Sequence, residues 1–308
     1  MPRKSSFTQE EKDIIYKMYV EDKVGCTTIS RVIHKNECTI ASYIAKNIGC
    51  RTRSEAARKY SCNSDFFETI DTEEKAYWLG FMYADGYVSS AGVYNHGTVG
   101  ISLNLCDYEH LEKFKKSMSA TYPIKTYKSK NSYNSSCEYC RLLIHNQKLY
   151  NDAIKQGIVE HKTNILTQPK ITNENLVKDF IRGYFDGDGC VSKNTKRNTY
   201  AIKILGTEDI LNYIKEFIHK NNIAQIKRYY KRKNSQTVSS LEFAGNNQTK
   251  RFLDIIYNKS TIYLDRKYKR YIELCNLLNS RTKTKVLSDK SSKLLETPNR
   301  TISSQVYK

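Results

Sequence analysis

Two aspartates in the chain have surroundings that suggest metal chemistry. Asp85 and Asp188 stand near the ends of two similar segments, LGFMYADG (79–86) and IRGYFDGDG (181–189). We expect each segment to end a helix, where the helix dipole repels a negative side chain. Two such carboxylates, brought together with neighbouring carbonyl oxygens, form a hard-oxygen set suited to Mg²⁺. An aspartate is unfavourable at a helix C-terminus, so its occurrence there in both segments indicates a function. The alternative is that each aspartate only forms a turn before glycine.

Small residues in the same segments predict how the two helices pack. They recur four positions apart, as Gly80 and Ala84 and as Gly183 and Gly187. Residues with this spacing share one helix face, and without large side chains two helix backbones can touch there. We therefore expect two helices side by side with their C-termini together. We also expect Gly86 and Gly189 to close them in the left-handed conformation.

The similarity continues after both segments and defines an internal repeat. Each segment is followed by a strand-like stretch, a helix, two further strand-like stretches and a second helix. In the second copy, the two later strands are expected near 225–233 and 236–244. We predict an αββαββα order in each of two repeats, residues 73–170 and 171–280. The predicted fold class is α+β, and two copies of one unit imply a pseudo-two-fold monomer.

Residues 1–60 are predicted to form a separate helix-turn-helix domain, joined to the repeats by a linker at 61–72. Helices are expected at 27–34 and 37–47, with a tight turn between them. Their expected core residues are Ile29, Val32, Ile33, Ile40 and Ile44. Outward-facing residues of the third helix, which would contact DNA, are Thr39, Ser42 and Lys46. A helical bundle that contacts only protein is the alternative.

The composition favours a nucleic-acid partner. Lysine and arginine number 51 against 32 acidic residues, which gives a net charge of +19. Such an excess suits a polyanion, although an AT-rich genome would also enrich lysine. The sequence contains no stretch of about 18 apolar residues, so no membrane-spanning helix is expected. With no export signal, the nine cysteines are expected to be reduced. We expect a location in the cytoplasm of a prokaryotic or phage-infected cell, with an organelle as the alternative.

The two segments resemble the paired motifs of the LAGLIDADG homing endonucleases. The resemblance covers roughly 73–280 and includes GIVEHKTN (157–164) and STIYLDRKYKRY (260–271). It implies that the last aspartate of each motif, Asp85 and Asp188, binds catalytic metal ions. Backbone carbonyls that help bind these ions would be those of Ala84 and Gly187, and the lysines near the two active centres would be Lys162 and Lys267. The chain departs from the pattern at Tyr83, where many members have an aspartate, whereas Asp186 is kept in the second motif.

The resemblance implies an enzyme that hydrolyses both strands of double-stranded DNA at a long asymmetric site, with Mg²⁺ or Mn²⁺ as cofactor. Its sheets would bind the DNA, with basic residues at Lys125, Lys128, Lys227, Arg228, Lys231 and Arg232. Residues 281–308 are expected to form a loosely ordered basic tail. The alternatives are an RNA maturase, with intron RNA as partner, and a transcription regulator without cleavage. The first and last residues of the chain favour a free-standing protein over an intein-borne one.

Overall fold

The structure is a computed structural model that describes residues 7–51, 59–90, 97–128, 138–231 and 237–295, without the side chains of Thr163 and of 282–295. The chain divides into two compact units, residues 1–61 and 62–308. Within the described part of the chain, no helix has the length and apolar character needed to span a membrane.

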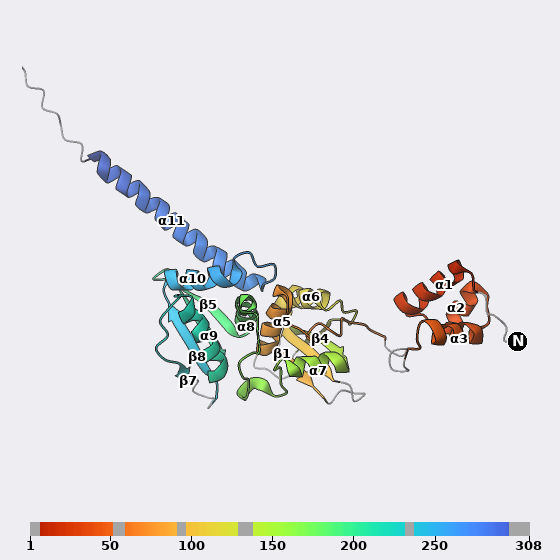
Figure 1. Ribbon diagram of the computed structural model, residues 1–308. Helices are drawn as coiled ribbons and strands as arrows, with labels where there is room; N and C mark the ends of the chain where they lie inside the picture. Colours follow the sequence, from red (N-terminus) through yellow and green to blue (C-terminus); the bar gives the residue numbers. More distant parts are fainter. Residues whose placement is uncertain (1–6, 52–58, 91–96, 129–137, 232–236, 296–308) are drawn as a thin grey trace, which may run out of the picture. The chain divides into compact units, whose positions relative to one another are not determined.

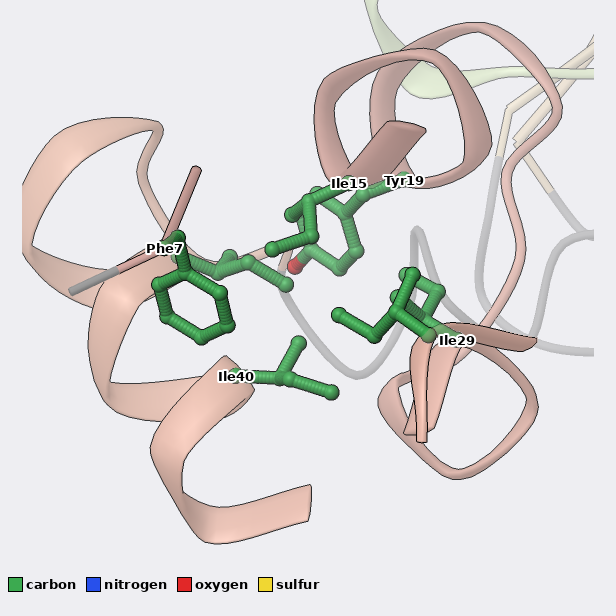
Figure 2. Close-up of a cluster of buried hydrophobic side chains, with 7 residues drawn as sticks. Phe7, Ile15, Tyr19, Ile29 and Ile40 are labelled. Carbon is green, nitrogen blue, oxygen red and sulfur yellow. The ribbon is translucent and has the colours of Figure 1, made fainter. Parts of the chain in front are cut away.

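The N-terminal unit is built from short helices around one small core. These are α1 (Gln9–Tyr16), the π-helical η1 (Lys17–Glu21), α2 (Cys26–Ile33) and α3 (Glu37–Asn47). Its buried residues are Phe7, Ile15, Tyr19, Ile29, Ile33, Ile40 and Ile44 (Figure 2). The prediction that Val32 belongs to this core is wrong, because its side chain is 52% exposed. Ile29 and Ile33, four residues apart, form the buried face of α2, and Val32 lies on another face.

The second unit contains two repeats with the predicted αββαββα order (Figure 1). The first repeat consists of α5 (Glu73–Ala84), β1 (Gly86–Ser89), β2 (Thr98–Asn104), α6 (Tyr108–Ser117), β3 (Lys125–Lys128), β4 (Glu138–His145) and α7 (Gln147–Lys155). The second consists of α8 (Val177–Asp188), β5 (Gly189–Asn194), β6 (Thr199–Gly206), α9 (Glu208–Lys220), β7 (Tyr230–Lys231), β8 (Ser239–Ala244) and α10 (Asn246–Tyr257). Short 3₁₀ turns are η2 (Leu105–Asp107), η3 (Lys162–Asn164) and η4 (Glu174–Leu176), and α11 (Asp265–Leu295) ends the described chain.

Each repeat forms one antiparallel four-stranded sheet, and the two sheets have the same strand order. The orders are β1-β2-β4-β3 and β5-β6-β8-β7. In the first sheet Ile101 of β2 pairs with Leu142 of β4, and both side chains are fully buried. In the second sheet the equivalent pair is Ile204 and Leu241. Because side chains alternate along a strand, the opposite face of each sheet carries the intervening, more exposed residues.

Three expectations about backbone conformation are wrong. Gly86 and Gly189 do not adopt the left-handed conformation, since each is the first residue of an extended strand. Of the described residues in the predicted strand 225–233, only Tyr230 and Lys231 form β7, and 232–233 lie outside the described residues. The backbone N–H of Ile226 donates to the His219 side chain instead of to a neighbouring strand. Helix α11 continues to Leu295, so the predicted loose tail is helical up to there, and 296–308 lie outside the described residues.

Candidate active site

Helices α5 and α8 pack against each other with their backbones in contact (Figure 1). A Cβ atom placed on Gly80 would lie 2.0 Å from the carbonyl oxygen of Phe180. One placed on Gly183 would lie 1.9 Å from the carbonyl oxygen of Tyr77. No larger residue fits either position without moving a helix, so the packing predicted from the small residues is confirmed.

The same packing brings Asp85 and Asp188 together at the ends of these helices. Asp85 caps α5 and Asp188 is the last residue of α8. A Cβ atom on Gly187 would lie 2.2 Å from the Cβ of Ala84 and 3.3 Å from Oδ2 of Asp85, so the two helix ends are in contact. Burial raises the pKa of both carboxyls, and the nearby Asp85 charge helps to raise the pKa of Asp188 to about 6. Burial, together with the Asp85 charge at Asp188, disfavours two negative charges at this place, and a cation would stabilise them.

Lys162 and Lys267 hold the two helix ends in the same way. The Lys162 ammonium donates to the carbonyl oxygens of the last α5 residues, Met82, Tyr83 and Ala84. The Lys267 ammonium donates to those of the last α8 residues, Phe185, Asp186 and Gly187. Burial lowers the pKa of both lysines, that of Lys267 to about 8. A cation on carbonyls at a helix C-terminus offsets the negative end of the helix dipole.

Asp186 positions Lys267 through the backbone. It is fully buried and accepts hydrogen bonds from the hydroxyls of Tyr77 and Tyr257 and from the backbone N–H of Leu264. The carbonyl of Leu264 in turn accepts from the N–H of Lys267 in the first turn of α11. Asp186 thereby fixes the start of the helix that carries the lysine.

Tyr83 occupies the position in α5 that Asp186 occupies in α8, and it has a related contact. Its hydroxyl donates to the carbonyl oxygen of Gln156, 2.7 Å away, at the start of the segment that leads to Lys162. Gly157 follows with a φ of +95°, and a Cβ there would lie 2.1 Å from the Tyr83 hydroxyl. The departure of Tyr83 from the motif therefore keeps a hydrogen bond to the segment that carries the lysine.

Arg182 is a buried residue of this interface that was not predicted from the sequence. Its guanidinium donates to the carboxylates of Glu73 and Asp179 and to the carbonyls of Ile256 and Ile262. These contacts join α5, α8, the end of α10 and the segment before α11. In the sequence, its buried position is indicated by the apolar and small residues that surround this arginine in IRGYFDGDG.

The basic residues predicted to contact DNA have several different settings. Lys125 is exposed on β3, and Lys128 forms an ion pair with Glu138 at 3.0 Å. Lys227, Arg228 and Lys231 are exposed in and before β7, whereas Arg232 lies outside the described residues. In α3, Ser42 and Lys46 are exposed and Thr39 is partly buried.

The residues at the two helix ends fit a hard divalent cation. Among the described residues, no group of three or more His, Cys, Asp or Glu side chains could hold a metal ion. A cation at Asp85 and Asp188 would therefore need further ligands, such as backbone carbonyls, water or phosphate oxygens. Mg²⁺ commonly binds in this way, with one or two carboxylates and the rest supplied by solvent or substrate. The carbonyls of Ala84 and Gly187 already accept from lysines, but a carbonyl oxygen has two lone pairs.

A family model described as LAGLIDADG-like domain matches residues 175–257. The matched segment begins within η4 and ends with α10, and it contains the whole sheet of the second repeat. A search of curated proteins finds no match.

Several solved structures resemble the chain at low sequence identity. The I-LtrWI LAGLIDADG homing endonuclease bound to target DNA is 14% identical, with a TM-score of 0.45 over 78% of this chain and 100% of that one. The LAGLIDADG meganuclease I-AabMI bound to uncleaved DNA is 13% identical, with a TM-score of 0.45 over 73% and 99%. The I-SmaMI LAGLIDADG homing endonuclease bound to cleaved DNA is 13% identical, with a TM-score of 0.44 over 70% and 92%.

We expect Asp188→Asn to stabilise the metal-free protein at neutral pH. A carboxyl whose pKa rises from its ordinary 3.8 to about 6 on folding stabilises the fold at low pH, and this contribution is lost as pH rises towards 6. Asparagine does not ionise, so the variant does not bury a negative charge at this position at neutral pH. Its free energy of unfolding should therefore be higher by about 2 kcal/mol at pH 7.5. The attraction of Lys162 for the Asp188 carboxylate is already included in this pKa.

Urea unfolding in EDTA measures this difference. Trp78, the only tryptophan, is fully buried in α5 and reports on the second unit. The two proteins should differ at pH 7.5 and converge near pH 4. A variant that is less stable than the wild type by the same amount at both pH values would contradict the expectation.

Proposed function

We propose that the protein is a LAGLIDADG-type homing endonuclease that hydrolyses both strands of double-stranded DNA at a long asymmetric site. The observation that carries the proposal is the convergence of Asp85 and Asp188 at the ends of two helices packed backbone to backbone. The family match over the second repeat supports it. Binding alone does not require two buried acids whose pKa values are raised by burial.

Asp85 and Asp188 would hold the divalent ions, Mg²⁺ or Mn²⁺, with help from the carbonyls of Ala84 and Gly187. Such ions, when bound, activate water and stabilise the leaving oxygen of a phosphodiester. Lys162 and Lys267 keep the carbonyls of the helix ends in place. Their charges lie beside the carboxylates and would offset negative charge that develops on the phosphate.

The two sheets would bind the DNA on either side of these helix ends. In the first sheet, Lys125 pairs with Arg141 on the face opposite the buried Leu142, and in the second sheet Lys231 is exposed on the edge strand β7. The repeats differ in sequence, so the site they recognise would be asymmetric. Because one chain supplies both carboxylates, a monomer suffices for cleavage. The N-terminal unit would bind flanking DNA through α3, with Thr39, Ser42 and Lys46.

Incubation of the protein with DNA that spans the insertion site of its own gene, with the insert removed, tests the proposal. Discrete cutting in Mg²⁺ that EDTA abolishes is the expected result. Tight binding with no cutting at any concentration of Mg²⁺ or Mn²⁺ would contradict it. That outcome would favour the maturase or regulator alternative.

A further inference from the structure

The outer face of the first sheet carries an arginine in the middle of strand β4. Arg141 pairs with Ser102 of β2 on one side and with Lys125 of β3 on the other. Its neighbours in β4, Cys140 and Leu142, are fully buried on the inner face. Arg141 therefore projects from the opposite, outer face.

Tyrosine side chains fix the position of the Arg141 guanidinium. The rings of Tyr127 and Tyr139 stack on each other at 5.1 Å, and the guanidinium lies 5.4 and 5.5 Å from their centres. Tyr87 lies across Gly100, where a Cβ would come within 2.6 Å of the tyrosine ring. Burial raises the pKa of Tyr87, and the nearby Arg141 charge partly offsets this increase. Cation–π contacts of this kind hold an arginine before any ligand binds.

One donor of Arg141 lacks an acceptor in the described part of the chain. Its Nε atom is buried and has no hydrogen-bond partner among the described residues. Buried polar groups in native proteins are rarely left unpaired. A guanidinium that tyrosines hold on the outer face of the sheet, with one donor that no described residue satisfies, is suited to a planar acceptor that approaches this face.

The second sheet differs at the equivalent position, Ser240, which pairs with Leu205 and Tyr230. The Ser240 hydroxyl donates to Glu242 at 2.7 Å, and Glu242 forms an ion pair with Lys203, also at 2.7 Å. The side chains of Ser240, Glu242 and Lys203 thus act as hydrogen-bond or ion-pair partners of one another. The unsatisfied donor is therefore a property of the first repeat and not of the repeated fold.

We infer that Arg141 recognises a guanine in the half of the DNA site bound by the first repeat. This inference rests on the proposed function. Guanine presents O6 and N7 in the major groove, which match the forked donors of arginine. The tyrosines restrict the side chain in advance, so little conformational entropy is lost on binding. A phosphate oxygen could also accept these bonds, but such a contact would carry no base preference.

Selection from a pool of random-sequence duplex DNA tests the inference. Full-length protein is used in EDTA, so that the DNA is bound and not cut. The wild type should enrich a motif with a guanine whose discrimination falls by about 10–100-fold in Arg141→Met, which has no hydrogen-bond donor. In Arg141→Gln the preferred base at that position should become adenine, because glutamine pairs with adenine N6 and N7. Lys116→Gln, at an exposed position in the last turn of α6, is the control and should retain the guanine.

The outcomes separate this inference from the proposed function. A guanine retained at full strength in both Arg141 variants would overturn the inference alone. So would a loss of affinity that is equal for all sequences, which indicates a phosphate contact. A wild-type protein that enriches no sequence would overturn the proposed function and the inference together. Trp78 fluorescence during thermal unfolding shows whether each variant is folded.

Discussion

Replacing Asp188 or Asp85 with asparagine should reduce the rate of DNA cleavage by at least about 10³-fold, or about 4 kcal/mol of transition-state stabilisation. Asparagine has nearly the same shape as aspartate but supplies no negative charge to a divalent ion. The two helix ends should stay together, because their packing depends on Gly80 and Gly183 and not on the carboxylates. DNA affinity in EDTA should therefore be retained while cleavage in Mg²⁺ is lost.

Single-turnover cleavage of labelled DNA, with binding measured in parallel, checks this expectation. Asp209→Asn is the control, since Asp209 is exposed in the first turn of α9, away from the helix ends. It should cut at the wild-type rate. Asp188→Asn protein that cuts as fast as the wild type would show that the reaction does not use this carboxylate.

Introducing valine at Gly183 should destabilise the second unit by about 3–5 kcal/mol. The new Cβ would lie 1.9 Å from the carbonyl oxygen of Tyr77, and a backbone atom cannot move aside as a side-chain end can. Replacing glycine within a helix normally gains at most about 1 kcal/mol. The steric overlap is the larger effect. Cleavage should also be lost, because α5 and α8 must separate and carry Asp85 and Asp188 apart.

Urea unfolding followed by Trp78 fluorescence measures the loss of stability. Gly25→Ala serves as the control, because a Cβ at Gly25 meets nothing within 4 Å and this residue lies in the N-terminal unit. That variant should leave the Trp78 transition unchanged. A Gly183→Val protein as stable as the wild type would mean that the two helices are not packed in backbone contact.

The repeat and the helix interface were predictable because their signals are local and occur twice. Glycine spacing shows directly which helix face lacks side chains, as at Gly80 and Gly183. Hydrophobic periodicity predicted the helix 37–47 with the bounds that the structure gives α3, and the Asn36 side chain caps its start. Capping side chains and apolar periods act within a few residues, so the sequence displays them.

Features that depend on distant partners were not predictable. Arg182 is stabilised by Glu73, which is far away in the sequence, and by carbonyls of α10 and the segment before α11. The hydrogen bond from Tyr83 to Gln156 likewise joins two elements. The role of Gly86 was misjudged because the helix leads directly into β1. Its missing side chain leaves room for the Met82 sulfur, which would lie 2.4 Å from a Cβ at this position, and no left-handed turn is needed.

Titration of Mn²⁺ or Mg²⁺ into the full-length protein, followed by calorimetry, tests the central claim most directly. That claim is that Asp85 and Asp188 together hold divalent ions. The wild type should bind the ions at pH 7.5 and lose them as pH falls below about 6, where Asp188 becomes protonated. The double variant Asp85→Asn, Asp188→Asn should not bind them at either pH. Equal binding by the wild type and the double variant would contradict the account.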